Sequence, residues 1–165
     1  MSTIINNSGI IFPNGNTQTS AAIVNSDIPV FSGNYTSSTT ISFATYTKVP
    51  LNSILKDTHG GWVSANNSYT VQKTGYYQVN GFTTVINNLA SAATRVNYNN
   101  SVFVSSGLFQ APSPAFSQWG GTAERVMYLT AGNSIWLEAY AQTYAYPTYV
   151  PSMANSWLNL YYIRS

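Results

Sequence analysis

The strongest pattern in the chain lies in residues 73–86, where two sets of side chains alternate after the turn-forming pair Thr74-Gly75. One set is Tyr77, Val79, Gly81, Thr83 and Val85, and the other is Tyr76, Gln78, Asn80, Phe82 and Thr84. A period of two predicts a β-strand, and aromatic or β-branched residues in both sets predict a central strand that is covered on both faces. Gly81 has no side chain, which indicates a close approach by a neighbouring element.

Shorter alternating runs predict further strands, and runs rich in turn-forming residues predict the loops between them. The strands span residues 28–35, 39–49, 69–72, 95–98, 102–109, 124–129, 134–140 and 157–163, and the loops span 51–61, 111–121 and 144–151. Roughly eight strands without a convincing helix predict an all-β antiparallel sandwich or barrel. The strands at 124–129 and 134–140 flank the turn Ala131-Gly132-Asn133, so we expect them to pair as a hairpin with one shared apolar face.

The last predicted strand is apolar on both faces. Trp157, Tyr161 and Ile163 would lie on one face, and Leu158, Leu160 and Tyr162 on the other. One face of an outer sheet is normally polar. A second apolar face therefore predicts a partner that covers it, and a symmetric copy of the chain is the usual partner.

Four short motifs follow one another between residues 50 and 158. They comprise Pro50, Leu51, Ile54, Leu55, Asp57 and Thr58, then Tyr69, Thr70, Val71, Gly75, Tyr77 and Val79, then Leu129, Ala131, Gly132, Asn133, Ile135 and Leu137, and finally Ser156 and Leu158. This series resembles the jelly roll shared by complement globular heads and tumour-necrosis-factor ligands, and the resemblance covers about residues 28–165.

The resemblance implies a ten-stranded, two-sheet antiparallel sandwich that assembles as a tight homotrimer. Our candidates for the trimer interface are Tyr77, Trp157, Leu158, Leu160 and Tyr162. The family often has Asp at the position of Asn133, and this chain lacks the acidic cluster that binds calcium in some members. We therefore expect no metal and no other cofactor.

Residues 9–19 contain two short β-prone pieces around the turn Pro13-Asn14-Gly15, which predicts a β-hairpin. So short a hairpin is unstable alone, so it either lies on its own domain or pairs with another chain. The run from Gly9 to Gly15, followed by Gln18-Thr19, resembles a segment of bacteriophage tail and capsid-associated proteins. We expect an anchoring arm at residues 1–27 ahead of a jelly-roll domain at residues 28–165. The expected anchoring residues are Ile10, Ile11, Phe12 and Pro13.

Composition narrows the possible partners. Charged residues are 6% of the chain, against ~25% in typical domains. The six basic residues are scattered, so we expect no nucleic-acid partner. The chain has no cysteine, no apolar run near the ~18 residues of a membrane helix, and no secretory signal in its first seven residues. We expect a protein without disulfides and without a membrane partner, made in a cytoplasm.

Candidate catalytic groups are few. Asp57 and His59 would share one face of a strand, but no nucleophile elbow accompanies them. The other acidic residues, Asp27, Glu124 and Glu138, fall in separate elements, which leaves no acid–base pair and too few ligands for zinc. We therefore expect a protein that is not an enzyme and has no catalytic residues.

Aromatic residues in the two later loops are the candidate ligand-binding residues. They are Trp119, Tyr144, Tyr146 and Tyr149. Flat amphipathic rings stack on sugars, so one hypothesis is that they bind a host-surface glycan. The alternative is that they pack the trimer or brace the proline-containing loops.

Together these features predict a bacteriophage virion structural protein. In this interpretation a trimeric jelly roll decorates or cements the capsid, and its arm contacts other virion proteins, above all the major capsid protein. The alternative is the glycan-binding, receptor-binding head of a phage tail fibre. A fibre usually carries a long shaft ahead of its head, and only ~27 residues precede the predicted domain, which favours capsid decoration. We expect the protein to reside in the virion after synthesis in the cytoplasm of a bacterial host.

Overall fold

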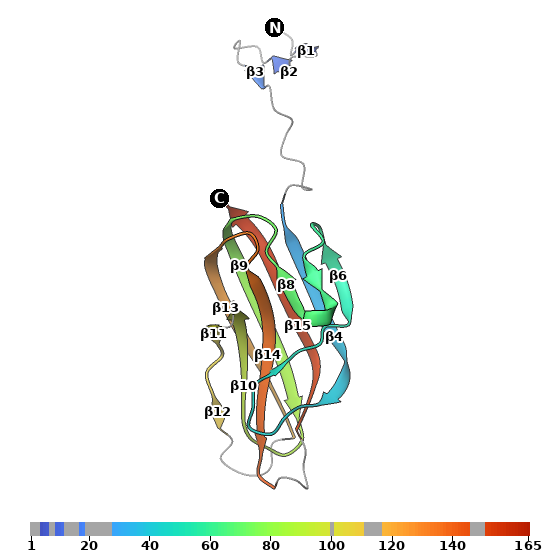
Figure 1. The fold of residues 1–165 in the computed structure, drawn as a ribbon, viewed down its shortest axis with the longest axis vertical. Coiled ribbons are helices and arrows are strands. Elements are labelled where there is room, and N and C mark those ends of the chain that lie inside the picture. Colours follow the sequence, from blue (N-terminus) through green and yellow to red (C-terminus); the bar gives the residue numbers. More distant parts are fainter. Residues whose placement is uncertain are drawn as a thin grey trace.

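The computed structural model describes residues 4–6, 9–11, 17–18, 28–99, 101–110, 117–145 and 151–165. Within these residues, a seven-stranded and a five-stranded sheet pack face to face, and three amino-terminal strands form a separate small sheet (Figure 1). The strand pairs among the described residues are antiparallel. The two large sheets form a jelly-roll sandwich, which confirms the predicted fold class.

The five-stranded sheet contains the strand that the sequence pattern placed at the centre. Across the sheet, the order is β13 (Gln118–Leu129), β9 (Gly75–Ile86), β15 (Ser152–Arg164), β4 (Val30–Thr40) and β6 (Ser53–Asp57). β9 pairs with β13 on one side and with β15 on the other, so its interior position is confirmed. Its inner face is buried, but Tyr76 and Gln78 on the other face are exposed. The chain itself therefore covers only one face of this half of β9.

The seven-stranded sheet forms the second layer. Its main path is β11 (Ser101–Ser105), β10 (Leu89–Tyr98), β14 (Ser134–Thr143), β8 (Ser68–Thr70) and β7 (Trp62–Val63), while β12 (Phe109–Gln110) pairs with β10 and β5 (Thr47–Lys48) pairs with β14. A single 3-10 turn, Ser64–Asn66, links β7 to β8 within the described chain. Asn67 closes that turn in the left-handed conformation that asparagine tolerates.

The three amino-terminal strands pair with one another. They are β1 (Ile4–Asn6), β2 (Gly9–Ile11) and β3 (Thr17–Gln18), with β2 in the middle. The β2–β3 pair confirms the predicted hairpin, and β1 adds a strand that the pattern did not predict. Phe12 and Pro13, two of the expected anchoring residues, lie outside the described residues. The division into arm and domain, and the anchoring role, stay predictions.

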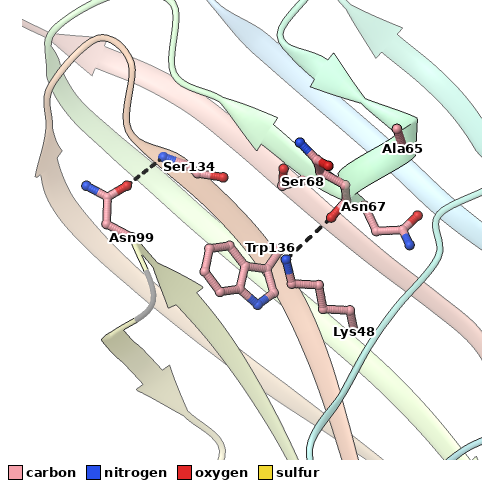
Figure 2. Close-up of a pocket in the computed structure, with 8 residues that line it drawn as sticks. Lys48, Ala65, Asn67, Ser68, Asn99, Ser134 and Trp136 are labelled. Carbon is pink, nitrogen blue, oxygen red and sulfur yellow. Dashed lines mark hydrogen bonds between the residues drawn. The ribbon is translucent and has the colours of Figure 1, made fainter.

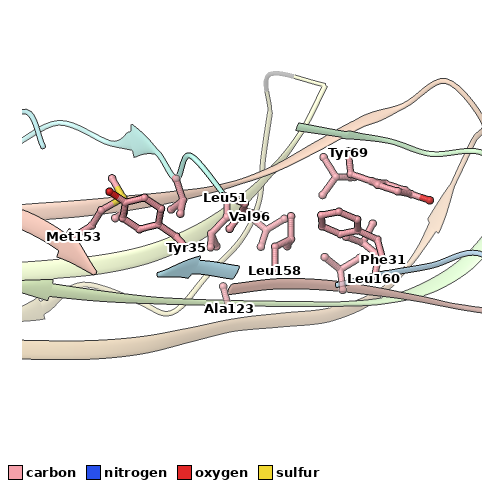
Figure 3. Close-up of a cluster of buried hydrophobic side chains, with 14 of the residues drawn as sticks. Phe31, Tyr35, Leu51, Tyr69, Val96, Ala123, Met153, Leu158 and Leu160 are labelled. Carbon is pink, nitrogen blue, oxygen red and sulfur yellow. The ribbon is translucent and has the colours of Figure 1, made fainter. Parts of the chain in front are cut away.

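The core lies between the inner faces of the two large sheets (Figure 3). The Phe31 ring stacks on Trp62 with centroids 5.3 Å apart and lies 4.9 Å from the Tyr69 ring, which ties the two sheets together. Side chains buried to 2% exposure or less include Val79, Val85, Val96, Ala123, Leu137, Met153, Leu158 and Leu160. These residues come from both sheets, so neither sheet is stable without the other.

Gly81 on β9 lies against side chains of the seven-stranded sheet. A Cβ atom at this position would lie 2.6 Å from Leu137 Cδ1 and 2.9 Å from Val96 Cγ2. Carbon atoms in contact normally lie about 3.5 to 4.0 Å apart, so residues of the seven-stranded sheet occupy the space that a side chain would need. The close neighbour predicted for Gly81 is confirmed.

The predicted hairpin between β13 and β14 is wrong. β13 pairs with β9, and β14 pairs with β10, β8 and β5, so the turn between them carries the chain from one sheet to the other. The residues predicted to be apolar and inward-facing are nonetheless buried: Met127 and Leu129 on β13 and Ile135 and Leu137 on β14 face the core from opposite sheets. An alternation of period two predicts which side chains of a strand are buried, but it does not identify the strand that pairs with it.

Several predicted segment boundaries are also wrong. The loop expected at 111–121 overlaps β13, which begins at Gln118 and so also extends the strand expected at 124–129. The strand expected at 157–163 begins at Ser152, and the one expected at 102–109 is divided into β11 and β12.

The strand expected at 39–49 is interrupted, because β4 ends at Thr40 and Ala44 adopts a left-handed φ of 52°. The loop expected at 51–61 contains β6, which pairs with β4 at the sheet edge. The strand expected at 95–98 begins earlier, at Leu89, where small residues such as Ala92 and Ala93 are buried. Small side chains give little contrast between the two faces, so local alternation did not reveal this part of the strand.

Candidate functional site

The first candidate site is the outer face of the five-stranded sheet, meaning the side chains of β9, β13 and β15 that point away from the core. Four large residues on this face are exposed: Tyr76 (41%), Val126 (54%), Tyr128 (55%) and Tyr161 (40%), and Ile163 (50%) is exposed at the irregularity near the end of β15. The three strands are adjacent, with β9 between β13 and β15. An apolar patch of this extent marks an interaction surface.

One pair of aromatic residues lies near each end of this face. Tyr76 and Tyr128 lie opposite each other in register, and their rings meet edge to face with centroids 5.3 Å apart. Farther along the strands, Phe82 and Trp157 are register partners whose rings stack with centroids 5.8 Å apart. Large rigid rings of this kind dominate the binding energy of protein interfaces.

A polar row separates the two aromatic pairs. Glu124, Asn80 and Asn159 lie opposite one another on the three strands. The side-chain oxygens of Asn80 and Asn159 are buried and accept no hydrogen bond within the described residues. A buried acceptor without a partner is destabilising by about 1 to 3 kcal/mol, so this row lowers the stability of the sheet within the single chain.

Most of the residues predicted to form the trimer interface lie on the inner side of the sandwich. Tyr77, Leu158 and Leu160 are 0%, 0% and 1% exposed within a single chain, so they have no surface to offer a partner and their predicted role is wrong. Tyr162 is half-buried and packs against the core and the Tyr77 ring at 5.3 Å, so it too belongs to the inner side. Trp157 is on the outer face, and its interface role stays a prediction. The residues of that face on β9 and β13 were missed, because the pattern alone did not pair these strands with β15.

Two buried tyrosines shape the inner side of this end of the sandwich. The Tyr77 hydroxyl donates a hydrogen bond to the Lys73 carbonyl oxygen at 2.6 Å. Burial raises the pKa of Tyr77 to about 12. Burial also raises the pKa of the Tyr69 hydroxyl above its ordinary value, and that hydroxyl has no hydrogen-bond partner among the described residues.

Asp57 and His59 form a loop-stabilising arrangement. The Asp57 carboxylate accepts hydrogen bonds from the backbone N–H groups of Gly61 at 3.1 Å and Trp62 at 2.9 Å. His59 Nδ1 lies 2.8 Å from Thr58 Oγ1, and its link to Asp57 runs through its backbone N–H at 3.4 Å. Both side chains are thus engaged in holding the turn between β6 and β7.

The described residues contain no group of three or more histidine, aspartate or glutamate side chains placed to hold a metal ion. In the same part of the chain, no helix is long and apolar enough to cross a membrane.

The predicted glycan-binding aromatics do not form one described cluster. Trp119 belongs to β13, and its ring stacks on Phe109 with centroids 5.9 Å apart and lies over Gly121, so it braces the sandwich. Tyr144 is 44% exposed, beside the turn that precedes β10. Tyr146 and Tyr149 lie outside the described residues. The glycan-binding role of these residues, and the alternative that they pack the trimer or brace the proline-containing loops, stay predictions.

A pocket that the sequence pattern did not predict opens on the outer side of the seven-stranded sheet (Figure 2). It has a volume of about 630 Å³ and is lined by Lys48, Ala65, Asn66, Asn67, Ser68, Asn99, Ser134 and Trp136. These residues come from four separate segments of the chain, so no local motif could reveal the pocket. One signal was present: Trp136 occupies an outward position between Ile135 and Leu137 of β14, and it is itself buried at 5% exposure.

The chain was compared with known proteins. No protein-family model and no curated protein sequence matches it. Solved structures do resemble it. The globular domain of a zebrafish complement 1qA protein has a TM-score of 0.60 at 14% identity, covering 83% of this chain and 99% of that one. Murine APRIL has a TM-score of 0.61 at 13% identity, covering 82% and 99%.

The Eiger TNF of S. frugiperda has a TM-score of 0.60 at 11% identity and covers 83% of this chain and 94% of its own. At these identities the likeness establishes the fold. It agrees with the jelly roll of complement heads and tumour-necrosis-factor ligands that the motifs between residues 50 and 158 indicated. The matched region leaves out about a sixth of this chain.

Proposed function

We propose that the chain assembles as a homotrimer in which the outer face of the five-stranded sheet is the interface between copies. The observation that carries this proposal is the run of exposed apolar side chains over three adjacent strands, including Val126, Tyr128 and Tyr161. A symmetric neighbour is the usual occupant of such a face. The trimer implied by the resemblance to complement heads and tumour-necrosis-factor ligands supports the same arrangement.

The size of the face suits a stable interface. β9 and β13 have 12 residues each and β15 has 13. With a rise of about 3.3 Å per residue and a strand spacing of about 4.8 Å, the three strands cover a strip of roughly 40 by 14 Å. With side chains included, this strip approaches the ~800 Å² that each partner of a standard interface buries.

A charge placed on this face tests its role. Val126→Asp puts a carboxylate beside Gln78, with Tyr161 on the other side of Gln78. We expect folded monomers at micromolar concentration, because burying an unpaired carboxylate outweighs the contacts of the interface. Leu108→Asp is the matched control, since Leu108 is 55% exposed, as Val126 is at 54%, but lies outside the five-stranded sheet. Sedimentation velocity reads out both variants. If Val126→Asp stays as assembled as Leu108→Asp, another surface joins the copies.

We further propose that the trimer is a structural component of a bacteriophage virion and decorates or cements the capsid through its amino-terminal arm. The resemblance of residues 9–19 to phage segments supports this role. The pairing of β1, β2 and β3 with one another agrees with a separate arm. Deleting residues 1–27 should leave a folded trimer that no longer attaches to its particle. Retained attachment at normal occupancy would place the binding surface on the sandwich instead.

The second candidate is the receptor-binding head of a tail fibre. The pocket over Trp136 favours it, because a polar, hydrogen-bonding pocket on the outside of the sandwich is suited to a saccharide. The number of copies per particle separates the two roles. Quantitative mass spectrometry of purified particles should find hundreds of copies of a capsid decoration protein, whereas a fibre head would be present in a few dozen at most.

A further inference from the structure

The pocket over Trp136 exists because β14 changes its neighbour on one side. β8 pairs with the start of β14 at Ser134, whereas β5 pairs with it farther along at Glu138. Trp136 lies between these two pairings, bordered by Asn67 and the preceding 3-10 turn on one side and by Asn99 on the other (Figure 2). The resulting volume of about 630 Å³ falls in the range of about 300 to 1,000 Å³ typical of ligand sites.

The pocket holds one positive charge. Lys48 is exposed, its Nζ lies 4.0 Å from the centre of the Trp136 ring, and it donates a long hydrogen bond to the Asn66 carbonyl oxygen at 3.4 Å. These two contacts place the ammonium on the pocket wall. An exposed ammonium at this position is available to pair with an anionic group of a ligand.

The nearest carboxylate does not neutralise Lys48. Glu138 lies opposite Lys48 in register, but both of its oxygens are already engaged. Oε1 accepts a hydrogen bond from Trp136 Nε1 at 2.7 Å, and Oε2 forms a salt bridge with Arg95 Nε at 2.6 Å. Arg95 therefore balances the charge of Glu138, and no acidic residue lines the pocket. The pocket as a whole favours an anion.

Neutral polar groups line the rest of the wall. Asn67 and Asn99 adopt left-handed φ values of 48° and 46°, and Asn99 Oδ1 accepts the Ser134 N–H at 2.8 Å, so these two residues also hold the backbone. Asn66 has no such constraint: it is exposed, and its side-chain amide makes no hydrogen bond within the described residues. Amides donate and accept, which matches the hydroxyl groups of a sugar.

We propose that this pocket binds a saccharide residue that carries a carboxylate, such as a terminal uronic acid. In this arrangement Lys48 binds the carboxylate and Asn66 and its neighbours bind ring hydroxyls, while the indole of Trp136, only 5% exposed, lies beneath Lys48 and supports its stem. A single ammonium suits the single charge of a carboxylate, whereas phosphate sites normally use several cations or a row of backbone N–H groups. The proposal is independent of the oligomeric state and of the particle.

The test titrates the full-length protein with methyl β-D-glucuronide and with methyl β-D-glucoside, which differ in the carboxylate. Saturation-transfer NMR reports binding up to about 10 mM ligand, the range expected of a single monosaccharide. We expect the glucuronide to bind at least about tenfold tighter than the glucoside, and added salt to weaken it. Lys48→Met keeps the apolar stem over Trp136 and should lose about tenfold in glucuronide affinity.

Lys73→Met is the matched control, because Lys73 also lies over an aromatic ring, that of Tyr162 at 4.8 Å, and does not line the pocket. Lys73→Met should leave the affinity for the glucuronide unchanged. Asn66→Ala, at an exposed position, should lower the affinity for both sugars several-fold without affecting folding. Circular dichroism verifies that each variant is folded. The proposal is overturned if the glucuronide does not bind, if Lys48→Met binds it as the unmodified chain does, or if acetate competes as well as the glucuronide.

Discussion

Gly81 offers a direct test of how the two sheets are held together. In Gly81→Ala, the new methyl group would lie 2.6 Å from Leu137 Cδ1 and 2.9 Å from Val96 Cγ2, about 1 Å closer than carbon atoms normally approach. Overpacking of this kind destabilises a core by about 1 to 3 kcal/mol. The lower backbone entropy of alanine in the unfolded chain offsets about 0.4 to 1 kcal/mol of this. We expect a net loss of roughly 1 to 2 kcal/mol in the free energy of unfolding.

A double-mutant cycle tests whether contact with Leu137 causes this loss of stability. Leu137→Ala alone should cost about 2 to 5 kcal/mol, because it leaves a cavity in the core. In that background Gly81→Ala would partly fill the cavity, so its effect should change sign and the two mutations should couple by at least about 1 kcal/mol. Leu129→Ala, in the same core but in register with Gly75, is the control and should be additive with Gly81→Ala.

The assay is urea denaturation followed by tryptophan fluorescence at one fixed protein concentration, since assembly makes apparent stability concentration-dependent. Additive effects of Gly81→Ala and Leu137→Ala would contradict the close packing of the two sheets at this point.

Two further predictions concern single residues. Burial raises the pKa of Tyr77 to about 12, from about 10 in an unfolded chain, so between pH 10 and 12 the unfolded state loses a proton that the folded state keeps. Stability should therefore fall by up to roughly 2 to 3 kcal/mol across that window, and Tyr77→Phe should flatten this fall in pH-dependent denaturation. Asp57→Ala leaves the N–H groups of Gly61 and Trp62 without their acceptor and should destabilise the chain by about 1 to 3 kcal/mol in urea denaturation; an unchanged midpoint would show that water replaces the carboxylate.

The sequence predicted features that depend on the alternation of a single strand. β9 was predicted because its alternation is long and rich in aromatic and β-branched residues, and the buried faces of β13 and β14 were predicted for the same reason. The neighbouring strand with which each strand pairs was harder to predict. The turn at Gly132 has the positive φ of 89° common in hairpins, yet it connects two sheets, and nothing local distinguishes these two uses.

The same distinction between local alternation and long-range pairing applies to the candidate sites. The two apolar faces of β15 were correctly read as unusual, but the sequence could not show that Leu158 and Leu160 face the core while Tyr161 faces outward with Val126. That assignment requires the pairing of β15 with β9. The pocket over Trp136 was not predicted at all, because Lys48 and Asn99 reach it from distant parts of the chain. Sites formed by long-range pairing leave no periodic signal in a single sequence.

The molar mass of the unmodified chain in solution tests the central claim most directly. One chain has a mass of 18.0 kDa, and sedimentation equilibrium at micromolar concentration should give three times this value, about 54 kDa. The exposed face of β9, β13 and β15 predicts that this mass is stable to dilution, since a covered apolar face of this size gives a tight interface. A soluble, folded species of 18 kDa at the same concentration would contradict the proposed trimer.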